Sequence, residues 1–394
     1  MLNNEIFIVA AVRTAIGGFG GSLKDVPLSE LAQIAVKGAL ERGGIAPQAV
    51  GHVVMGTVVP TEPKDAYLAR VAAMGAGIPS EVPAFNVSRL CGSGLQAIIS
   101  GVQIVAAGDA QIVVAGGAES MSRGVYISQA SRWGARLGNS TLVDYVLDVL
   151  HDPFHRIHMG MTAENVAKQE GITRAMQDEL ALESQRRAAR ALAEGRFVSQ
   201  IVPVDIKSKK GVIRFELDEH VRGDITAEQL AKMRPAFKEG GTVTAGNSSG
   251  LNDGASALVL ASAAAVRTDK LKPLARLVAY AHAGVDPTLM GLGPIPATQA
   301  ALKRAGLQAS DMSVVESNEA FAAQACAVTR RLGLDPAVVN PNGSGISMGH
   351  PVGATGAIIA TKAIHELHRI GGRYALTTMC IGGGQGIAAI FERT

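Results

Sequence analysis

The sequence contains few cysteines, few aromatic side chains and almost no excess charge. Three cysteines among 394 residues are too few to cross-link a chain of this length, and their odd number leaves at least one unpaired. We therefore expect free thiols, a reducing compartment and a cytoplasmic protein. The formal net charge of +3 indicates neither a nucleic-acid partner nor a membrane partner. The first residues lack a basic segment followed by an apolar one, so we expect no signal peptide.

Apolar residues and glycine are abundant. Apolar side chains make up 47% of the residues, and 46 residues are glycine. That composition is typical of an α/β protein with much buried backbone, and the length allows two core-sized units or one duplicated unit. The mean hydropathy of +0.21 favours an oligomer. The uncharged stretch 90–108 has apolar residues at helical spacing, interrupted by Ser and Gln, so we expect a helix in a soluble core rather than a membrane span.

Three glycine-rich turns hold the reactive side chains of the chain. The first surrounds Cys91, the second His350 and the third Cys380. The glycines allow backbone N–H groups to approach a substrate closely. Two thiols and one imidazole suit an enzyme that exchanges thioesters, since one thiol can carry an acyl group while the other groups move protons. The alternatives are cysteines that act as small buried hydrophobes and a loop histidine bonded to backbone.

Two pairs of segments match at nearly the same offset. Residues 39–56 and 301–318 both read as a helix, a glycine cap and a β-branched strand, with Ala39 and Ala301 262 positions apart. A second pair aligns Ala97 with Ala357, which are 260 positions apart. We interpret the matches as an internal duplication, the alternative being chance similarity between Ala- and Gly-rich helices.

The duplication predicts that two of the reactive residues meet. Cys91 lies just before the first copy of an inner helix, and His350 lies at the equivalent place before the second copy. A pseudo-twofold axis would pack the two helices side by side with their N-termini close together. The positive end of each helix dipole then predicts a lowered pKa for Cys91 and a neutral His350.

The composition changes between residues 121 and 246. This part is richer in charge and holds the single tryptophan, Trp133. We expect it to be an inserted domain over one face of the duplicated core, with an amphipathic helix over residues 174–194. We expect the arginines of that helix to lie on its solvated face. They are Arg186, Arg187 and Arg190.

Eight motifs, which occur in order from Ile6 to Glu392, resemble the thiolase family of acetyl-CoA acyltransferases. Overall the chain resembles bacterial β-ketothiolases of polyhydroxyalkanoate synthesis. The run 151–160 resembles members that accept ketoacyl chains longer than acetoacetyl. The motifs are Val12-Arg-Thr-Ala-Ile-Gly, Cys91-Gly-Ser-Gly-Leu-Gln-Ala, Gly116-Gly-Ala-Glu-Ser-Met-Ser, His158-Met-Gly-Met-Thr-Ala-Glu-Asn, Thr244-Ala-Gly-Asn-Ser-Ser-Gly-Leu-Asn-Asp-Gly, Asn318-Glu-Ala-Phe-Ala, Gly349-His-Pro-Val-Gly and Cys380-Ile-Gly-Gly-Gly.

The resemblance implies the α/β thiolase fold, with two duplicated α/β/α/β/α halves and an inserted loop domain. We expect an N-terminal half over residues 1–120, completed by 247–268, and a C-terminal half over 269–394. Residues 121–246 would form the loop domain for CoA binding and tetramerisation. The family further implies a homotetramer with the segment 123–139 in its contacts, although a dimer remains an alternative.

The resemblance also implies roles for the reactive residues. Cys91 would be the nucleophile that forms an acyl-enzyme, His350 the base that activates it, and Cys380 the second acid/base. Asn318 would hold a water near His350, and that water and His350 Nε2 would form one oxyanion hole. Backbone N–H groups of Cys91 and Gly382 would form the other. The activity implied is reversible condensation of acyl-CoA with acetyl-CoA, and CoA-dependent thiolysis of the 3-ketoacyl-CoA product.

Coenzyme A is expected as a substrate, with no cofactor and no metal. By resemblance, Ser249 would bond the pantetheine amide and Arg222 would lie beside the adenine nucleotide. The glycine run 381–386 lacks the spacing of a dinucleotide fingerprint, so NAD is not expected. His151, His155 and His158 lack further ligands at metal-binding spacing. The other CoA contacts implied are Leu150, His158, Met159, Ala245, Met290, Ala320 and Phe321.

Two other classes of protein remain open at this point. Ketoacyl synthases and hydroxymethylglutaryl-CoA synthase resemble this fold but carry a His, Asn or Glu where Cys380 stands. A non-catalytic acyl-CoA-binding scaffold would have lost part of the reactive set, which is complete here. Cys326 is assigned to packing, and a reversible disulfide between Cys91 and Cys380 is a hypothesis. The direction of the reaction in the cell and the chain-length preference are left open.

Overall fold

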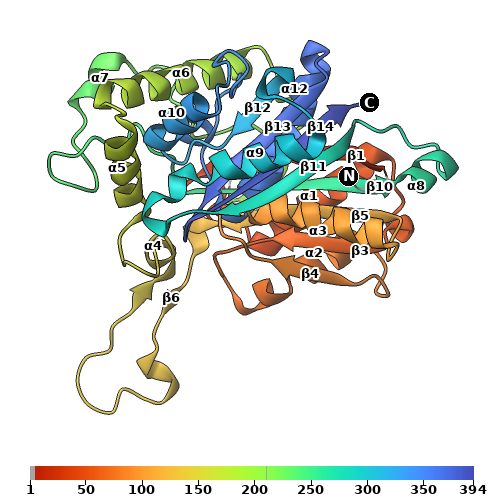
Figure 1. The fold of residues 1–394 in the computed structure, drawn as a ribbon. Helices are drawn as coiled ribbons and strands as arrows, with labels where there is room; N and C mark the ends of the chain where they lie inside the picture. The colour runs from red at the N-terminus through yellow and green to blue at the C-terminus, as the bar shows by residue number, and fades with distance from the viewer. Residues whose placement is uncertain (1–4, 210) are drawn as a thin grey trace.

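The computed structural model describes residues 5–209 and 211–394, and its core is a ten-stranded mixed sheet. The strand order is β12-β13-β14-β11-β1-β10-β5-β3-β4, with β2 paired to β10 (Figure 1). The strands of this sheet are β1 (Ile6–Arg13), β2 (Gly17–Gly18), β3 (His52–Gly56), β4 (Ala84–Val87), β5 (Ile112–Ser120), β10 (Asn252–Ser262), β11 (Ala275–Gly284), β12 (Met312–Ser317), β13 (Tyr374–Ile381) and β14 (Gln385–Arg393).

The strand pairing shows the internal duplication. In one half β1, β10, β5 and β3 lie side by side, and in the other β11, β14, β13 and β12 do. In both series, taken in this order, the first two neighbouring strand pairs are antiparallel and the third is parallel. The innermost pair of each series, β1–β10 and β11–β14, also carries a register shift at the same place, between Ile8 and Ala10 in β1 and between Leu277 and Ala279 in β11. The prediction of a duplication is therefore confirmed, and β1–β11 pairing joins the two halves.

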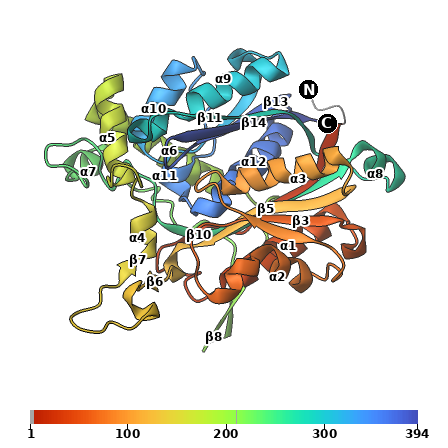
Figure 2. The same cartoon turned by 60° about the horizontal axis from the view of Figure 1, so that its bottom comes forward.

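Helices cover the sheets in layers that the two halves share. Helix α1 packs on β1, β10 and β5, and α9 packs on β11 and β14, so these helices form the outer layers. Helices α3 and α12 pack against each other and against strands of both halves, which makes them the central layer (Figures 1 and 2). The core helices are α1 (Leu28–Gly43), α2 (Leu68–Gly75), α3 (Ser93–Ala107), α8 (Ala263–Thr268), α9 (Pro294–Ala305), α10 (Ala322–Arg331), α11 (Gly345–Met348) and α12 (Val352–Ile370).

The central helices cross where each has a glycine. A β-carbon on Gly94 would lie 2.7 Å from the backbone nitrogen of Ala357, and one on Gly356 would meet the backbone of Leu95. The two contacts are reciprocal, since each glycine faces the backbone of the other helix. Because no side chain separates the backbones there, the N-termini of α3 and α12 are held close together.

Helix α3 belongs to the core, as predicted. Among the described residues one helix, over residues 90–107, is long and apolar enough to cross a membrane by length and composition alone, and 61% of that window is buried. Leu95, Ile98 and Val102 are fully buried against strands of the sheet. A helix packed in this way on both sides is a core helix.

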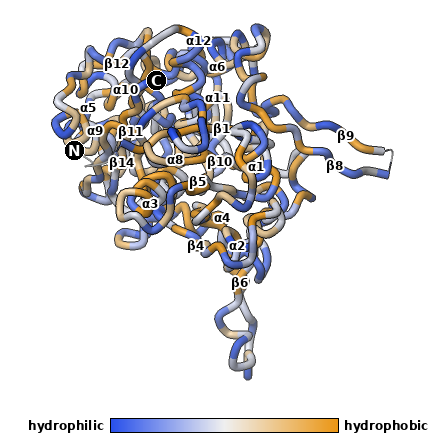
Figure 3. Tube along the Cα trace, turned by 90° about the vertical axis from the view of Figure 1, so that its right-hand side faces the viewer, coloured by the Kyte–Doolittle hydropathy of each residue, from blue (hydrophilic) through white to orange (hydrophobic). Residues whose placement is uncertain are grey.

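The inserted segment lies over one end of the core and sends out two projections. Trp133 and Leu137 are 90% and 99% exposed in the loop between β6 and β7, which extends far from the body (Figure 1). The β8–β9 hairpin projects separately (Figure 3). The elements of this segment are β6 (Tyr126–Ile127), β7 (Val143–Asp144), α4 (Tyr145–Val149), α5 (Met159–Glu170), α6 (Arg174–Ala193), β8 (Val204–Ser208), β9 (Gly211–Phe215) and α7 (Ala227–Lys232).

Short 3₁₀ turns connect several of these elements. They are η1 (Pro47–Ala49), η2 (Pro63–Tyr67), η3 (Met121–Arg123), η4 (Ala130–Arg132), η5 (Pro287–Leu292) and η6 (Ala309–Asp311).

Helix α6 matches the predicted amphipathic helix, but one of its arginines is not solvated. Arg186 and Arg190 are exposed as expected. Arg187 instead donates from Nη1 to the carbonyl oxygens of Pro336 (3.2 Å) and Val339 (2.5 Å). The expectation for Arg187 is therefore wrong, because loop carbonyls from the C-terminal half lie above that turn of the helix.

The glycine crossing yields a test of what holds the core together. Gly356→Ala places a β-carbon against the backbone of Leu95, which cannot move without moving α3, and should cost about 3 kcal/mol, the upper end for overpacking. The matched control is Gly101→Ala in α3, whose β-carbon meets side chains and not backbone, Leu260 Cδ1 at 2.6 Å and the Ala115 and Val113 side chains at 3.2 Å. The control should stay within about 1 kcal/mol, because the helix propensity of alanine offsets the contact. Equal thermal midpoints for the two variants would contradict this account of the crossing.

Candidate active site

A cavity of about 590 Å³ opens where the two halves and the inserted segment meet. It brings together Cys91, His350, Cys380 and Gly382 from three separate parts of the chain. Of the site residues expected from the sequence, all line this cavity except Asn318, which lies behind His350. The others in its wall are Leu150, His158, Met159, Arg222, Ala245, Ser249, Met290, Ala320 and Phe321.

A strained turn presents Cys91 just before α3. Leu90 has a φ of 47°, a left-handed conformation that non-glycine residues seldom adopt and that clusters at functional sites. The Ser93 hydroxyl holds the turn, because it donates to the Leu90 carbonyl (2.7 Å) and accepts from the Arg89 N–H (2.8 Å). The thiol is partly exposed to the cavity.

His350 is held at the start of α12. Its backbone N–H donates to Asn252 Oδ1 at 2.9 Å, and its Nδ1 lies 2.7 Å from the Thr355 hydroxyl. Burial lowers the pKa of His350 to about 4. The prediction of a neutral histidine is thus confirmed, although burial is the cause and not the helix dipole.

The thiols behave differently from the prediction. Burial raises the pKa of Cys91 to about 11, even though the backbone N–H groups of Gly382 and of Cys91 itself interact with the sulfur and oppose the shift. Burial, together with the neighbouring Cys91, raises the pKa of Cys380 further still. The expectation that a helix end lowers the pKa of Cys91 is therefore wrong, because desolvation outweighs the dipole. Both thiols are protonated at neutral pH, so Cys91 needs a base.

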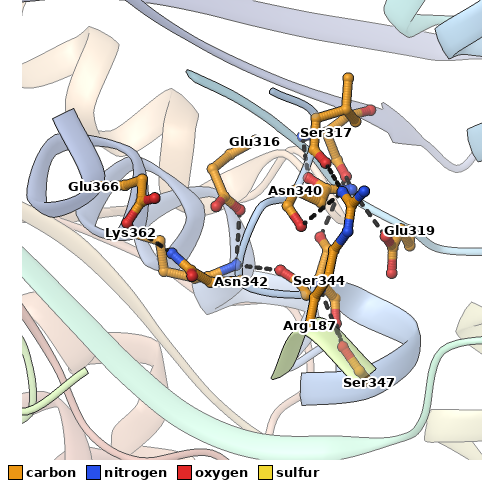
Figure 4. Close-up of polar contacts among 12 residues, drawn as sticks. Arg187, Glu316, Ser317, Glu319, Asn340, Asn342, Ser344, Ser347, Lys362 and Glu366 are labelled. Carbon is orange, nitrogen blue, oxygen red and sulfur yellow. Dashed lines mark hydrogen bonds and ion pairs between the residues drawn. The ribbon is translucent and has the colours of Figure 1, made fainter. Parts of the chain in front are cut away.

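Asn318 lies behind the cavity, beside the histidine ring. Its Nδ2 is 3.5 Å from His350 Nε2, and its Oδ1 has no hydrogen-bond partner among the described residues. Asn340 clamps the chain on both sides of it (Figure 4). The Asn340 amide accepts from Ser317 N–H (2.9 Å) and donates to the Ser317 carbonyl (2.8 Å) and to Glu319 Oε1 (2.9 Å).

The same buried network ties α12 to the end of β12. Lys362 Nζ lies 2.8 Å from Glu316 Oε2, and both side chains are buried (Figure 4). Lys362 also donates to the Gly343 carbonyl at 2.6 Å. The segment that carries Asn318 is therefore fixed relative to the helix that begins beside His350.

The rest of the cavity is an apolar tunnel. Met159, Met290, Ala320 and Phe321 pack in one cluster with Cys380. His158 caps α5, where its Nδ1 accepts from the Gly160 N–H at 3.0 Å. The described residues contain no group of three or more His, Cys, Asp or Glu side chains that could hold a metal.

Comparison with known proteins identifies the family. A model of the thiolase N-terminal domain matches residues 6–264, and one of the thiolase C-terminal domain matches residues 271–393. The chain belongs to the thiolase family. It is 62% identical to the β-ketothiolase BktB of Cupriavidus necator over the whole length of both chains. It is 48% identical to an acetyl-CoA acetyltransferase of the same organism, over 99% of each chain.

Solved structures agree with this assignment. A crystal structure of human mitochondrial 3-ketoacyl-CoA thiolase in complex with CoA superposes with a TM-score of 0.97, at 45% identity over 100% of this chain and 99% of the other. As a thiolase, the present chain is an acyltransferase. It condenses acyl-CoA with acetyl-CoA and reverses the reaction by thiolysis, through a cysteine acyl-enzyme. The two other classes of protein left open by the sequence are thereby set aside.

Sequence reasoning missed several residues in and around the thiolase site. Phe237 stacks on His158 with ring centroids 4.7 Å apart, and His220 lines the cavity. Glu119 is fully buried and accepts from the N–H groups of Val59 (3.0 Å) and Gly353 (2.7 Å). Burial raises the pKa of Glu119 to about 7. Glu119 stands in a motif that resembles the family, but only the fold shows that it joins the end of β5 to the first turn of α12.

Cys326 lies outside the active-site cavity. It is partly buried on α10, packs beside the apolar cluster of the tunnel, and contacts the Met176 carbonyl at 3.7 Å. Its assignment to packing is confirmed. All three cysteines are free thiols.

The pKa values yield a test with an internal control. Above the His350 pKa of about 4 the neutral imidazole can accept the Cys91 proton during the attack itself, so alkylation of Cys91 by iodoacetamide should keep a component that does not depend on pH from pH 5 to pH 8 and that is lost below pH 5. Burial also raises the pKa of Cys326 to about 11, and no base assists it, so its alkylation should rise about tenfold per pH unit. Peptide mass spectrometry measures both rates. A Cys91 rate that climbs in parallel with that of Cys326 would show that His350 does not assist.

Proposed function

We propose that this thiolase is a short-chain β-ketothiolase in which Cys91 carries the acyl group. The observation that supports it most is the cavity that joins Cys91, His350 and Cys380 from both halves of the duplication. The 62% identity to a β-ketothiolase supports the substrate class, acetoacetyl-CoA and slightly longer 3-ketoacyl-CoA. Its place would be the supply of 3-ketoacyl-CoA, as in polyhydroxyalkanoate synthesis.

The first half-reaction loads Cys91. His350 Nε2 takes the thiol proton as the sulfur attacks the thioester carbonyl of an acyl-CoA. The tetrahedral oxyanion meets the N–H groups of Cys91 and Gly382, which already interact with the sulfur in the resting protein. The C–S bond to CoA breaks, and the CoA thiolate takes its proton from Cys380. The acyl-enzyme is left with an imidazolium at His350 and a thiolate at Cys380.

The second half-reaction makes the carbon–carbon bond. The Cys380 thiolate removes a proton from the α-carbon of acetyl-CoA, and the enolate oxygen faces His350 Nε2–H and a water held by Asn318. The enolate carbon attacks the acyl-enzyme carbonyl, the Cys91 thiolate leaves, and His350 returns its proton. Thiolysis follows the same steps in reverse, so Cys380 then takes the proton of the incoming CoA. Protons balance over the cycle.

The tunnel suits a pantetheine chain. Its wall is mostly apolar, and Ser249 would bond the pantetheine amide near the reactive end. Arg222 also lines the cavity, where it would lie beside the adenine nucleotide. In this scheme CoA is a substrate, and the reaction uses no cofactor and no metal.

The proposal includes the organisation of the chain. The N-terminal half would comprise residues 1–120 and 247–268, the C-terminal half residues 269–394, and the loop domain residues 121–246. In a homotetramer the projecting segment 123–139 would be buried between subunits. The exposure of Trp133 in the single chain supports this role, because a large apolar side chain there lacks a partner surface. Free thiols support a reducing, cytoplasmic setting.

The test is CoA-dependent thiolysis of acetoacetyl-CoA and 3-ketovaleryl-CoA. The native protein should cleave both, and Cys91→Ala should lose activity by at least about 10⁴-fold, because alanine has no sulfur on which the acyl-enzyme can form. The matched control is Cys326→Ala, which removes a thiol outside the cavity and should keep nearly full activity. Cleavage of acetoacetyl-CoA alone would narrow the protein to an acetyl-CoA acetyltransferase. An active Cys91→Ala variant would overturn the assignment.

A further inference from the structure

The ring of His350 has a hydroxyl partner in the first turn of α12, the helix that follows it. Thr355 Oγ1 lies 2.7 Å from Nδ1 and donates to the Pro351 carbonyl at 2.8 Å. His350 is 6% exposed and Thr355 2%, so bulk water does not compete for this contact. A hydroxyl has one proton to donate. When that proton goes to Pro351, the oxygen that faces Nδ1 can only accept.

We propose that Thr355 is a positioning residue that keeps His350 in the Nδ1–H tautomer and leaves the lone pair on Nε2. The inference rests on the proposed role of His350 as the base for Cys91. Nδ1 is occupied by Thr355, so Nε2 is the nitrogen that can receive a proton from the cavity. The Asn318 amide group near Nε2 is a donor, which also suits an acceptor there.

The opposite tautomer would disable the base. If the Thr355 hydroxyl donated to Nδ1, the ring proton would lie on Nε2, and Nε2 could not take the Cys91 proton. Thr355 is not needed to place the histidine backbone, because Asn252 Oδ1 binds the His350 N–H at 2.9 Å. Its contact with the ring therefore acts on the proton and the ring orientation rather than on the position of the loop.

The tautomer links the two half-reactions. In the resting protein Nε2 is an acceptor, and it becomes a donor only after it has taken the proton of Cys91. The oxyanion hole for the enolate is then complete only while Cys91 carries an acyl group. Thr355 can accept from Nδ1–H both before and after this change, so the ring need not turn between the two steps.

The experiment compares Thr355→Val and Thr355→Ala, which remove the hydroxyl, with Thr355→Ser, which keeps it. We expect Val and Ala to lower kcat/KM for thiolysis about 10²-fold, within the range for loss of general-base catalysis, with little change in KM. Cys91 alkylation at pH 7 should slow by a similar factor and lose the component that does not depend on pH. Ser should restore both values to within about threefold of the native protein, and Cys326 alkylation should not change in any variant.

Two results would overturn the inference. One is native Cys91 alkylation in Thr355→Val and Thr355→Ala, with the component that does not depend on pH retained. The other is a Ser variant as slow as Ala, which would mean that the side chain fills space and does not hold a proton. Two hydroxyl-free variants of different size keep the test decisive where one fails to fold. Thiolysis by Cys91→Ala separates the cases: if it is active, the proposed function fails, and if it is inactive, only the tautomer is in question.

Discussion

The contact between the two central helices at Gly94 and Gly356 determines where the chemistry takes place. A side chain at either position would meet backbone of the other helix, so the helices can approach only with glycine at the crossing. Their N-termini then lie together and carry Cys91 and His350 into one cavity, from positions 259 residues apart. The duplicated sheets serve this contact, since each half supplies one helix and the strands on which it packs.

Burial is the second consequence of this arrangement, and it sets the protonation state of the site. Desolvation pushes the pKa of Cys91 up to about 11 and that of His350 down to about 4, so both side chains are uncharged in the resting site. Forming the imidazolium of His350 and the thiolate of Cys380 therefore costs free energy in this buried site. The attraction between the two charges and the hydrogen bonds of the oxyanion-hole donors together offset that cost. Such a site favours proton transfer when substrate has excluded water, which suits an enzyme whose acyl-enzyme must not be hydrolysed.

Sequence reasoning could predict the duplication and the main site because both leave local signals. The offset between Ala39 and Ala301 follows from repeated local patterns, and the glycine-rich turns around Cys91 mark a close approach of backbone. The pKa of Cys91 could not be predicted, because burial depends on what the whole fold packs around the thiol. Arg187 and Phe237 likewise depend on loops that are distant in sequence, and nothing in their own surroundings along the chain indicates those partners.

The two hydroxyls next to the crossing glycines have related tasks. Ser93 precedes Gly94 in the first turn of α3, and Thr355 precedes Gly356 in the first turn of α12. Ser93 donates to the Leu90 carbonyl and so shapes the turn that presents the nucleophile, while Thr355 donates to the Pro351 carbonyl and contacts the ring of the base. In both helices a hydroxyl in the first turn satisfies a carbonyl just before the helix, as N-terminal hydroxyls commonly bond nearby backbone. In α12 its free lone pair also meets a histidine, so a local helix-end bond has become a constraint on where the catalytic proton resides.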